Sequence, residues 1–317
     1  MRPTVYISAG PVKSSSFPTK QILPRNIRCP KGTILVRRIQ KEDISMENVP
    51  LWVSPTITSS QKSIGENVAQ PAQGHQVATL AMRTKNTGVQ GNINLWGPEV
   101  AANQFSSALI FAASDEGSVQ NYIATGWSVN SALYPNYTRL HVFWTKDSGQ
   151  TTGCFNLLCP GFVQVSQNIA PGVILQPLST FGGSQFEIPL NIRQDTHTGN
   201  WWVSLGDKNI GYYPQELFTT LKSGADGVGW GGEISSPTTE ALPGMGSSHF
   251  PELGPGKACY ISHMQLFSNS GQVIYPDANS VINYASKSEC YKVKYVGDNG
   301  GQSGHYMFFG GPPDCQI

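Results

Sequence analysis

The segment that decides the fold class is residues 75–95, which reads HQVATLAMRTKNTGVQGNINL. Two runs typical of strands, Gln76–Arg83 and Gly91–Leu95, flank the turn-forming sequence Asn86-Thr87-Gly88. The same alternation of short strand-like runs with turn signals continues to the end of the chain. This pattern predicts an all-β fold, an antiparallel β-sandwich of two sheets.

The other strand-like runs are Ala108–Ala112, Tyr122–Val129, Arg139–Trp144, Gly161–Val165, Asn200–Leu205, Asn209–Tyr213, Gly227–Ile234, Ala258–Phe267, Cys290–Val296 and His305–Phe309. One segment is typical of a helix, because Pro214 suits a first helical position and Gly224 suits a stop. Between them, Leu217, Phe218 and Leu221 form an apolar stripe. We therefore expect one short helix beside the two sheets.

The composition supports this class and excludes others. Glycine (34) and proline (22) make up roughly 18% of the 317 residues, against a usual ~12%. Charged residues reach only 13%, and the 21 basic and 20 acidic side chains nearly cancel, so nothing favours nucleic acid or an anionic membrane as a partner. A coiled coil would be richer in Glu, Lys and Leu. With 39% hydrophobic residues, the chain can bury a core.

The chain divides into two regions. Residues 1–70 are irregular, with several prolines, and we interpret them as an extended leader or linker. No linker-like change of composition occurs over 71–317, so we expect one β domain there. The N-terminus lacks the apolar run of about 7–15 residues of a signal peptide, and no run of about 18 apolar residues predicts a membrane span. The low charge suits a secreted protein, and a secreted protein needs an export signal. Because the sequence shows none, we expect it to be truncated at its N-terminus.

Cysteine placement suggests two disulfides without proving them. Cys154 and Cys159 enclose a short loop, and Cys290 and Cys315 bracket the C-terminal segment. Buried free thiols are the alternative. Neither pair has the spacing of a zinc site, and we expect no metal or cofactor. Asn136 begins a glycosylation sequon, Asn136-Tyr137-Thr138.

A glycine-rich stretch, Gly227–Glu233, offers one acidic side chain. It contains neither GxGxxG nor a Lys-Ser/Thr pair, so a phosphate site is not expected. One interpretation is a groove into which Glu233 points. The alternative is a glycine-bearing strand with a solvent-facing Glu233.

Histidines and tryptophans give weaker signals. We expect solvated or packed side chains at all six histidines, which are His75, His141, His197, His249, His263 and His305. No GxSxG motif supports a Ser-His-Asp triad. Trp201 and Trp202 point to opposite faces of a strand, so one packs in the core and the other lines a cleft or is also buried.

Five segments together resemble the neprosin domain. They are Thr152–Gln164 (TGCFNLLCPGFVQ), Thr198–Trp202 (TGNWW), Trp230–Ile234 (WGGEI), Met245–Pro251 (MGSSHFP) and Phe309–Pro312 (FGGP). Upstream, Cys29–Thr33 with Arg37-Arg38 resembles the end of that family's N-terminal activation segment. The resemblance implies a β-sandwich with the active site in a groove, and a plant secreted glutamic endopeptidase that cleaves after proline at acidic pH.

The resemblance also implies site residues. It assigns one catalytic glutamate to Glu233, and it places the other where this chain has Ala124, within Ile123-Ala124-Thr125-Gly126-Trp127. It supports the pairs Cys154–Cys159 and Cys290–Cys315, and leaves Cys29 and Cys259 unpaired. A two-carboxylate site shares one proton and activates water against the scissile carbonyl, and alanine does neither.

We therefore expect a weak or inactive endopeptidase that acts on proline-containing polypeptides. A non-catalytic neprosin-like module that binds proline-rich or cell-wall polypeptides is the alternative. A carbohydrate-binding sandwich is a third, resting on fold analogy alone. Asp115 or Glu116, upstream on the same expected hairpin, are possible substitutes for the missing glutamate.

Overall fold

The computed structural model describes residues 19–20, 33, 74–116, 119–237, 240–298, 300 and 303–315. The predicted leader, residues 1–70, lies outside the described residues apart from Thr19, Lys20 and Thr33. The predicted division of the chain at residue 70 therefore stays a prediction.

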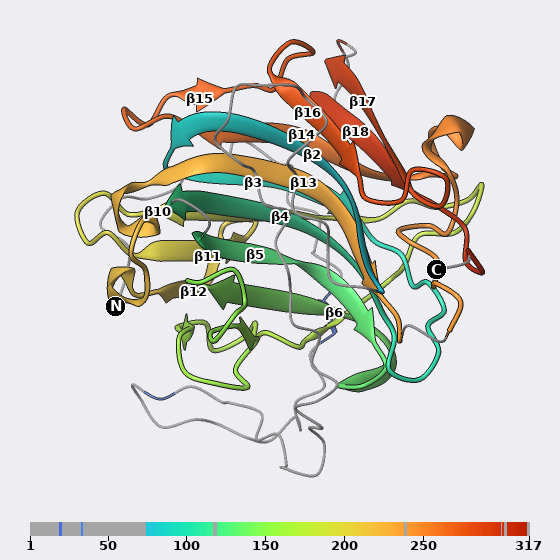
Figure 1. Cartoon of the computed structure of the whole chain (residues 1–317), viewed down its shortest axis with the longest axis horizontal. Coiled ribbons are helices and arrows are strands. Elements are labelled where there is room, and N and C mark those ends of the chain that lie inside the picture. The colour runs from blue at the N-terminus through green and yellow to red at the C-terminus, as the bar shows by residue number, and fades with distance from the viewer. Residues whose placement is uncertain are drawn as a thin grey trace.

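Two antiparallel sheets pack face to face (Figure 1). The first runs in the order β1-β9-β6-β5-β4-β13-β2-β16, with β7 beside β6. Its strands are β1 (Thr19–Lys20), β2 (His75–Asn86), β4 (Phe105–Glu116), β5 (Val119–Asn130), β6 (Tyr134–Thr145), β7 (Cys154–Phe155), β9 (Ile174–Leu175), β13 (Ala225–Ser235) and β16 (Val281–Ala285). The predicted all-β sandwich is confirmed.

The second sheet runs in the order β17-β18-β14-β3-β10-β11-β12-β8, with β15 beside β14. Its strands are β3 (Gly88–Asn94), β8 (Val163–Gln164), β10 (Glu187–Gln194), β11 (Trp201–Leu205), β12 (Lys208–Tyr213), β14 (Cys259–Phe267), β15 (Val273–Ile274), β17 (Lys292–Asp298) and β18 (His305–Gly310). In the part of the chain that is described, no helix is long and apolar enough to cross a membrane.

Six of the described strands were not predicted, namely the two-residue strands β1, β7, β9 and β15 and the longer strands β10 and β16. In β10 the alternating residues Ile188, Leu190 and Ile192 are all buried, but Pro189 interrupts them, and a proline argues against an interior strand. β16 lies at an edge and contains no buried residue, so it lacks the period-two pattern that reveals a half-buried strand.

The predicted helix is split into two 3-10 turns, η3 (Gln215–Leu217) and η4 (Leu221–Ser223). The Asn121 side chain accepts hydrogen bonds from the backbone N–H groups of Thr219 (2.8 Å) and Thr220 (3.1 Å). These two N–H groups are therefore not available to the backbone hydrogen bonds of a continuous helix, and the backbone of Phe218 is extended. A third 3-10 turn, η5 (Pro251–Leu253), lies outside the predicted segment.

Tryptophan side chains connect the two sheets through the core. Trp127 on β5 donates from its indole N–H to the Asn94 carbonyl oxygen at 2.8 Å, and Trp230 on β13 donates to that of Gln90 at 2.9 Å. Both acceptors lie on β3 of the opposite sheet. Gly91 between them leaves room for Trp230, since a Cβ there would lie 3.1 Å from the indole. Each indole is fully buried with its only donor satisfied.

Both predicted disulfides, Cys154–Cys159 and Cys290–Cys315, are present. Cys259 is a buried free thiol whose pKa is raised well above its ordinary value by burial. Cys29 lies outside the described residues, as does the side chain of Asn136, so its glycosylation stays a prediction.

Gly232 allows β13 to approach β18, and we predict that Gly232→Ala destabilises the fold. A Cβ at this position would lie 2.5 Å from Cε2 of Phe309 and 3.0 Å from Cγ of Met245. Overpacking of this kind typically costs about 1–3 kcal/mol of unfolding free energy, which urea titration measures. Gly153→Ala is the control, because its Cβ would make only ordinary contacts at 3.6 Å. Equal stability of the two variants would contradict this packing.

Candidate functional site

Glu233 lies on the face of the first sheet that points away from the second sheet. Because Trp230 points into the core, Gly229, Gly231 and Glu233 alternate with it onto the other face of β13. Only 4% of Glu233 is exposed, so the interpretation of a solvent-facing glutamate is wrong.

Two polar side chains contact the carboxylate of Glu233. Ser107 Oγ on β4 donates to Oε1 at 3.2 Å, because Ser107 is the direct cross-strand neighbour of Glu233. His75 Nε2 at the start of β2 lies 3.3 Å from Oε2, and His75 is itself only 3% exposed. Among the described residues, none is a hydrogen-bond partner of His75 Nδ1. The three side chains form the Glu233 cluster.

Burial raises the pKa of Glu233. The hydrogen bond from His75, the charge of His75 and the hydrogen bond from Ser107 each act to lower it, and burial outweighs them. Glu233 therefore holds its proton to a higher pH than an exposed glutamate, which suits a general acid. The cluster is not a nucleophilic triad, since the Ser107 hydroxyl contacts the carboxylate rather than the imidazole.

Ala124 does not face Glu233. Ala124 on β5 pairs with Phe111 on β4, and Phe111 pairs with Gly229 on β13. Glu233 instead pairs with Ser107, which is four residues from Phe111 along β4. On the spacings of an antiparallel sheet, positions 124 and 233 are roughly 13 Å apart along the strands and roughly 10 Å across them.

Residues that pair directly across neighbouring strands form a cross-strand row. The two positions that the resemblance pairs therefore lie in different cross-strand rows and are not direct neighbours in the sheet. The catalytic roles that the resemblance assigns to these positions stay a prediction. In the row of Ala124, the residue on β13 is Gly229. None of the three residues of that row on β5, β4 and β13, which are Ala124, Phe111 and Gly229, is an acid.

Aromatic rings occupy the surroundings of Ala124. The Tyr122 ring lies 5.2 Å from that of Phe111 and 6.2 Å from that of Phe143, in a buried cluster that also contains Phe155. The pKa of Tyr122 is raised well above its ordinary value by burial, and further by the negative charge of Glu233. This part of the face is therefore apolar, with one phenol within electrostatic reach of the Glu233 cluster.

Asp115 is not positioned to replace the missing glutamate. It pairs with Gln120 at the far end of β4, eight residues from Ser107 and so roughly 26 Å away along the strand. Its carboxylate binds Arg83 (3.0 Å) and Gln120 (2.7 Å). The side chain of Glu116 lies outside the described residues.

His75 and Ser107 were not predicted as site residues. His75 is 158 residues from Glu233 in the chain, and only the pairing of β2 with β13 brings them together. The cross-strand register alone reveals Ser107. Trp201 and Trp202 are both buried, so neither lines a cleft.

These observations define a two-sheet sandwich with one buried carboxylate on the outer face of its first sheet. The family model described as Neprosin matches residues 102–312, which is more than half of the chain. The chain belongs to the neprosin family.

Two solved structures that this chain resembles are distant from it in sequence. The crystal structure of scytalido-glutamic peptidase with a transition state analog inhibitor is 9% identical, with a TM-score of 0.40, over 75% of this chain and 98% of that chain. CG-16, a homodimeric agglutinin from chicken liver, is 7% identical, with a TM-score of 0.27, over 49% of this chain and 92% of that chain.

We predict that Glu233 makes the fold less stable as the pH rises. Its folded pKa lies above its unfolded value, so the folded protein binds this proton more tightly. The stability that Glu233 contributes is therefore present below its unfolded pKa and is lost as the pH rises through its folded pKa. The unfolding free energy of the native chain minus that of Glu233→Gln should be larger at pH 4 than at pH 7, as measured by urea titration.

The same comparison in a His75→Gln background removes the imidazole from the cluster. The pH dependence that Glu233 contributes should grow there, because His75 lowers the pKa of Glu233. An identical pH dependence with and without the Glu233 carboxyl would refute the assigned shift.

Proposed function

We propose that this neprosin-family chain is a secreted protein that acts on proline-containing polypeptides, with impaired glutamic endopeptidase activity. The observation that carries the impairment is the cross-strand row Ala124–Phe111–Gly229, which contains no carboxylate. Secretion is supported by the two disulfides and by the family.

The chemistry explains the expected loss of rate. Glutamic peptide hydrolysis needs one carboxylate to take a proton from water and a second, protonated one to polarise the scissile carbonyl. Glu233, with its raised pKa, suits the second task. Loss of a general base typically lowers the rate by ~10²–10⁴-fold.

A non-catalytic module that binds proline-rich polypeptides is the second candidate. The buried rings of Phe111, Tyr122 and Phe143 favour it, since they fill the part of the face where the first glutamate is expected. The two candidates differ in whether the bound polypeptide is cleaved.

We predict little cleavage of a proline-containing peptide at acidic pH by the native chain, and no gain with Ala124→Glu alone. A gain of at least ~10²-fold should need Ala124→Glu with Gly229→Glu, which together place two acids in one row. Phe111→Ala must accompany them, because a Cβ at position 229 would overlap the Phe111 ring. That Cβ would also lie 2.8 Å from the backbone carbonyl oxygen of Leu80, so circular dichroism must first show that the triple variant folds. Mass spectrometry of the digest measures each rate.

Two further variants test the residual activity. Any slow native cleavage should disappear with Glu233→Gln. Robust native cleavage that requires His75 and Glu233 would overturn the proposed impairment, because the imidazole would then be the missing base. Cleavage that is indifferent to Glu233 would remove Glu233 from the site.

We predict that a polyproline peptide binds the native chain saturably, with an affinity that changes less than about threefold in Glu233→Gln. Isothermal titration calorimetry at acidic pH measures it. Binding without turnover would favour the non-catalytic module. An absence of binding would remove polyproline recognition from both candidates.

A further inference from the structure

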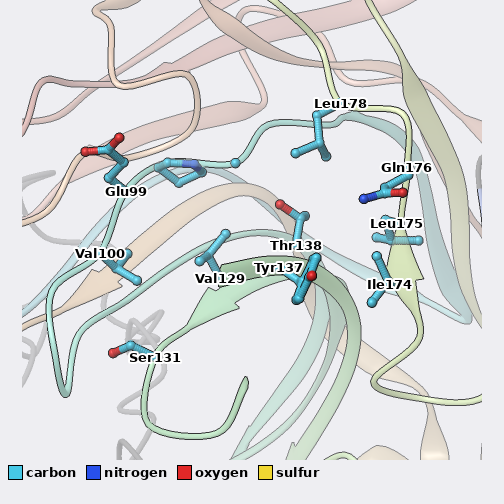
Figure 2. A pocket seen from close by; sticks show the side chains of 12 residues that line it. Glu99, Val100, Val129, Ser131, Tyr137, Thr138, Ile174, Leu175, Gln176 and Leu178 are labelled. Atoms are coloured by element: carbon cyan, nitrogen blue, oxygen red, sulfur yellow. The ribbon is translucent and has the colours of Figure 1, made fainter. Parts of the chain in front are cut away.

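A cavity of about 500 Å³ lies at the end of the first sheet where β4 begins and β5 ends. The loop that follows β3 forms one wall with Glu99 and Val100, and β9 with the segment after it forms the opposite wall (Figure 2). Val129 and Tyr137 lie between the two walls. The lining includes none of His75, Ser107 and Glu233.

The chemistry of the lining selects a ligand class. Val129, Ile174 and Leu175 are buried and aliphatic, so they favour an apolar group. Glu99 is the single charged residue among the twelve that line the cavity, and it is exposed. Tyr137 is 45% exposed and offers an aromatic surface. The cavity therefore suits an aliphatic group with a cation beside it, and it disfavours an anion.

The strand next to the cavity already accepts an extended chain. β1 pairs antiparallel with β9, with Thr19 opposite Leu175 and Lys20 opposite Ile174. Leu175 and Ile174 also line the cavity. A polypeptide paired with β9 in this way lies beside the opening, and main-chain hydrogen bonds would hold it there, as in β-strand addition.

We propose that β9 and this cavity form a docking site for an extended polypeptide that carries a basic residue close to aliphatic ones. The backbone pairs with β9, an aliphatic side chain enters the cavity, and the basic side chain interacts with Glu99. The site goes beyond the proposed function, because it needs neither Glu233 nor hydrolysis.

The test uses a fluorescent peptide of residues 16–25, SFPTKQILPR, which contains Thr19-Lys20 followed by Ile22 and Leu23. Because β1 competes for β9 in the native chain, the receptor is the full chain with Thr19→Pro and Lys20→Pro. Proline has no backbone N–H, so these substitutions weaken the pairing of β1 with β9. Fluorescence anisotropy should show saturable binding, at least ~5-fold tighter than to the native chain.

Two matched pairs of variants in this background locate the peptide. Val100→Trp fills the cavity and should weaken binding at least ~10-fold, whereas Val100→Ala should change it less than ~2-fold. Glu99→Gln should weaken binding ~3–5-fold at low salt and less at high salt, whereas Glu216→Gln, an exposed acid on η3, should have no effect. Thermal melting followed by circular dichroism checks the fold of each variant, and Leu178→Phe from the opposite wall replaces Val100→Trp if the latter unfolds.

Three results would overturn the proposal. One is peptide binding that neither cavity-filling variant weakens. Another is equal binding of a scrambled peptide. The third is equal binding of a peptide with glutamate in place of Lys20. Failure of polyproline binding or of cleavage would leave this result unaffected, so the two proposals fail separately.

Discussion

The hydrogen bonds from the indoles of Trp127 and Trp230 to the backbone of β3 are the constraint on which the arrangement of the first sheet depends. A buried indole N–H without a partner costs free energy, so each ring is held in the one orientation that reaches a carbonyl oxygen. With Trp230 turned toward the core, the alternation of side chains along β13 places Gly229, Gly231 and Glu233 on the opposite face. A shift of the strand by one residue would exchange the two faces, burying Glu233 between the sheets.

The site follows from that register. Glu233 is paired with Ser107 and lies near His75 because β4 and β2 flank β13 on its two sides. Burial leaves this carboxyl with a raised pKa, and its two polar neighbours limit the cost of withdrawing it from water. The same register places Ala124 in a different row, with Gly229 and beneath aromatic rings. One face of one sheet therefore carries a polar cluster and an apolar cluster side by side.

Local sequence predicted most of the strands, because alternating apolar residues and turn formers report burial of one face directly. It failed where a local signal and a tertiary contact disagree. Pro189 argued against a strand that the apolar residues of β10 nevertheless form. The segment after Pro214 has a helical apolar stripe, yet the Asn121 side chain takes the N–H groups that a continuous helix needs.

The sequence by itself determined the resemblance to the neprosin β-sandwich, the single glutamate in the glycine-rich motif and the alanine at position 124, and it suggested the two disulfides. Those properties are carried by residue identity and short-range spacing. Only the tertiary structure decided which side chains meet. Strand pairing joined His75 to Glu233 across 158 residues and separated Glu233 from position 124. Cross-strand register is a property of the whole sheet, since it is set by core side chains and turns distant from the site, and no single motif encodes it.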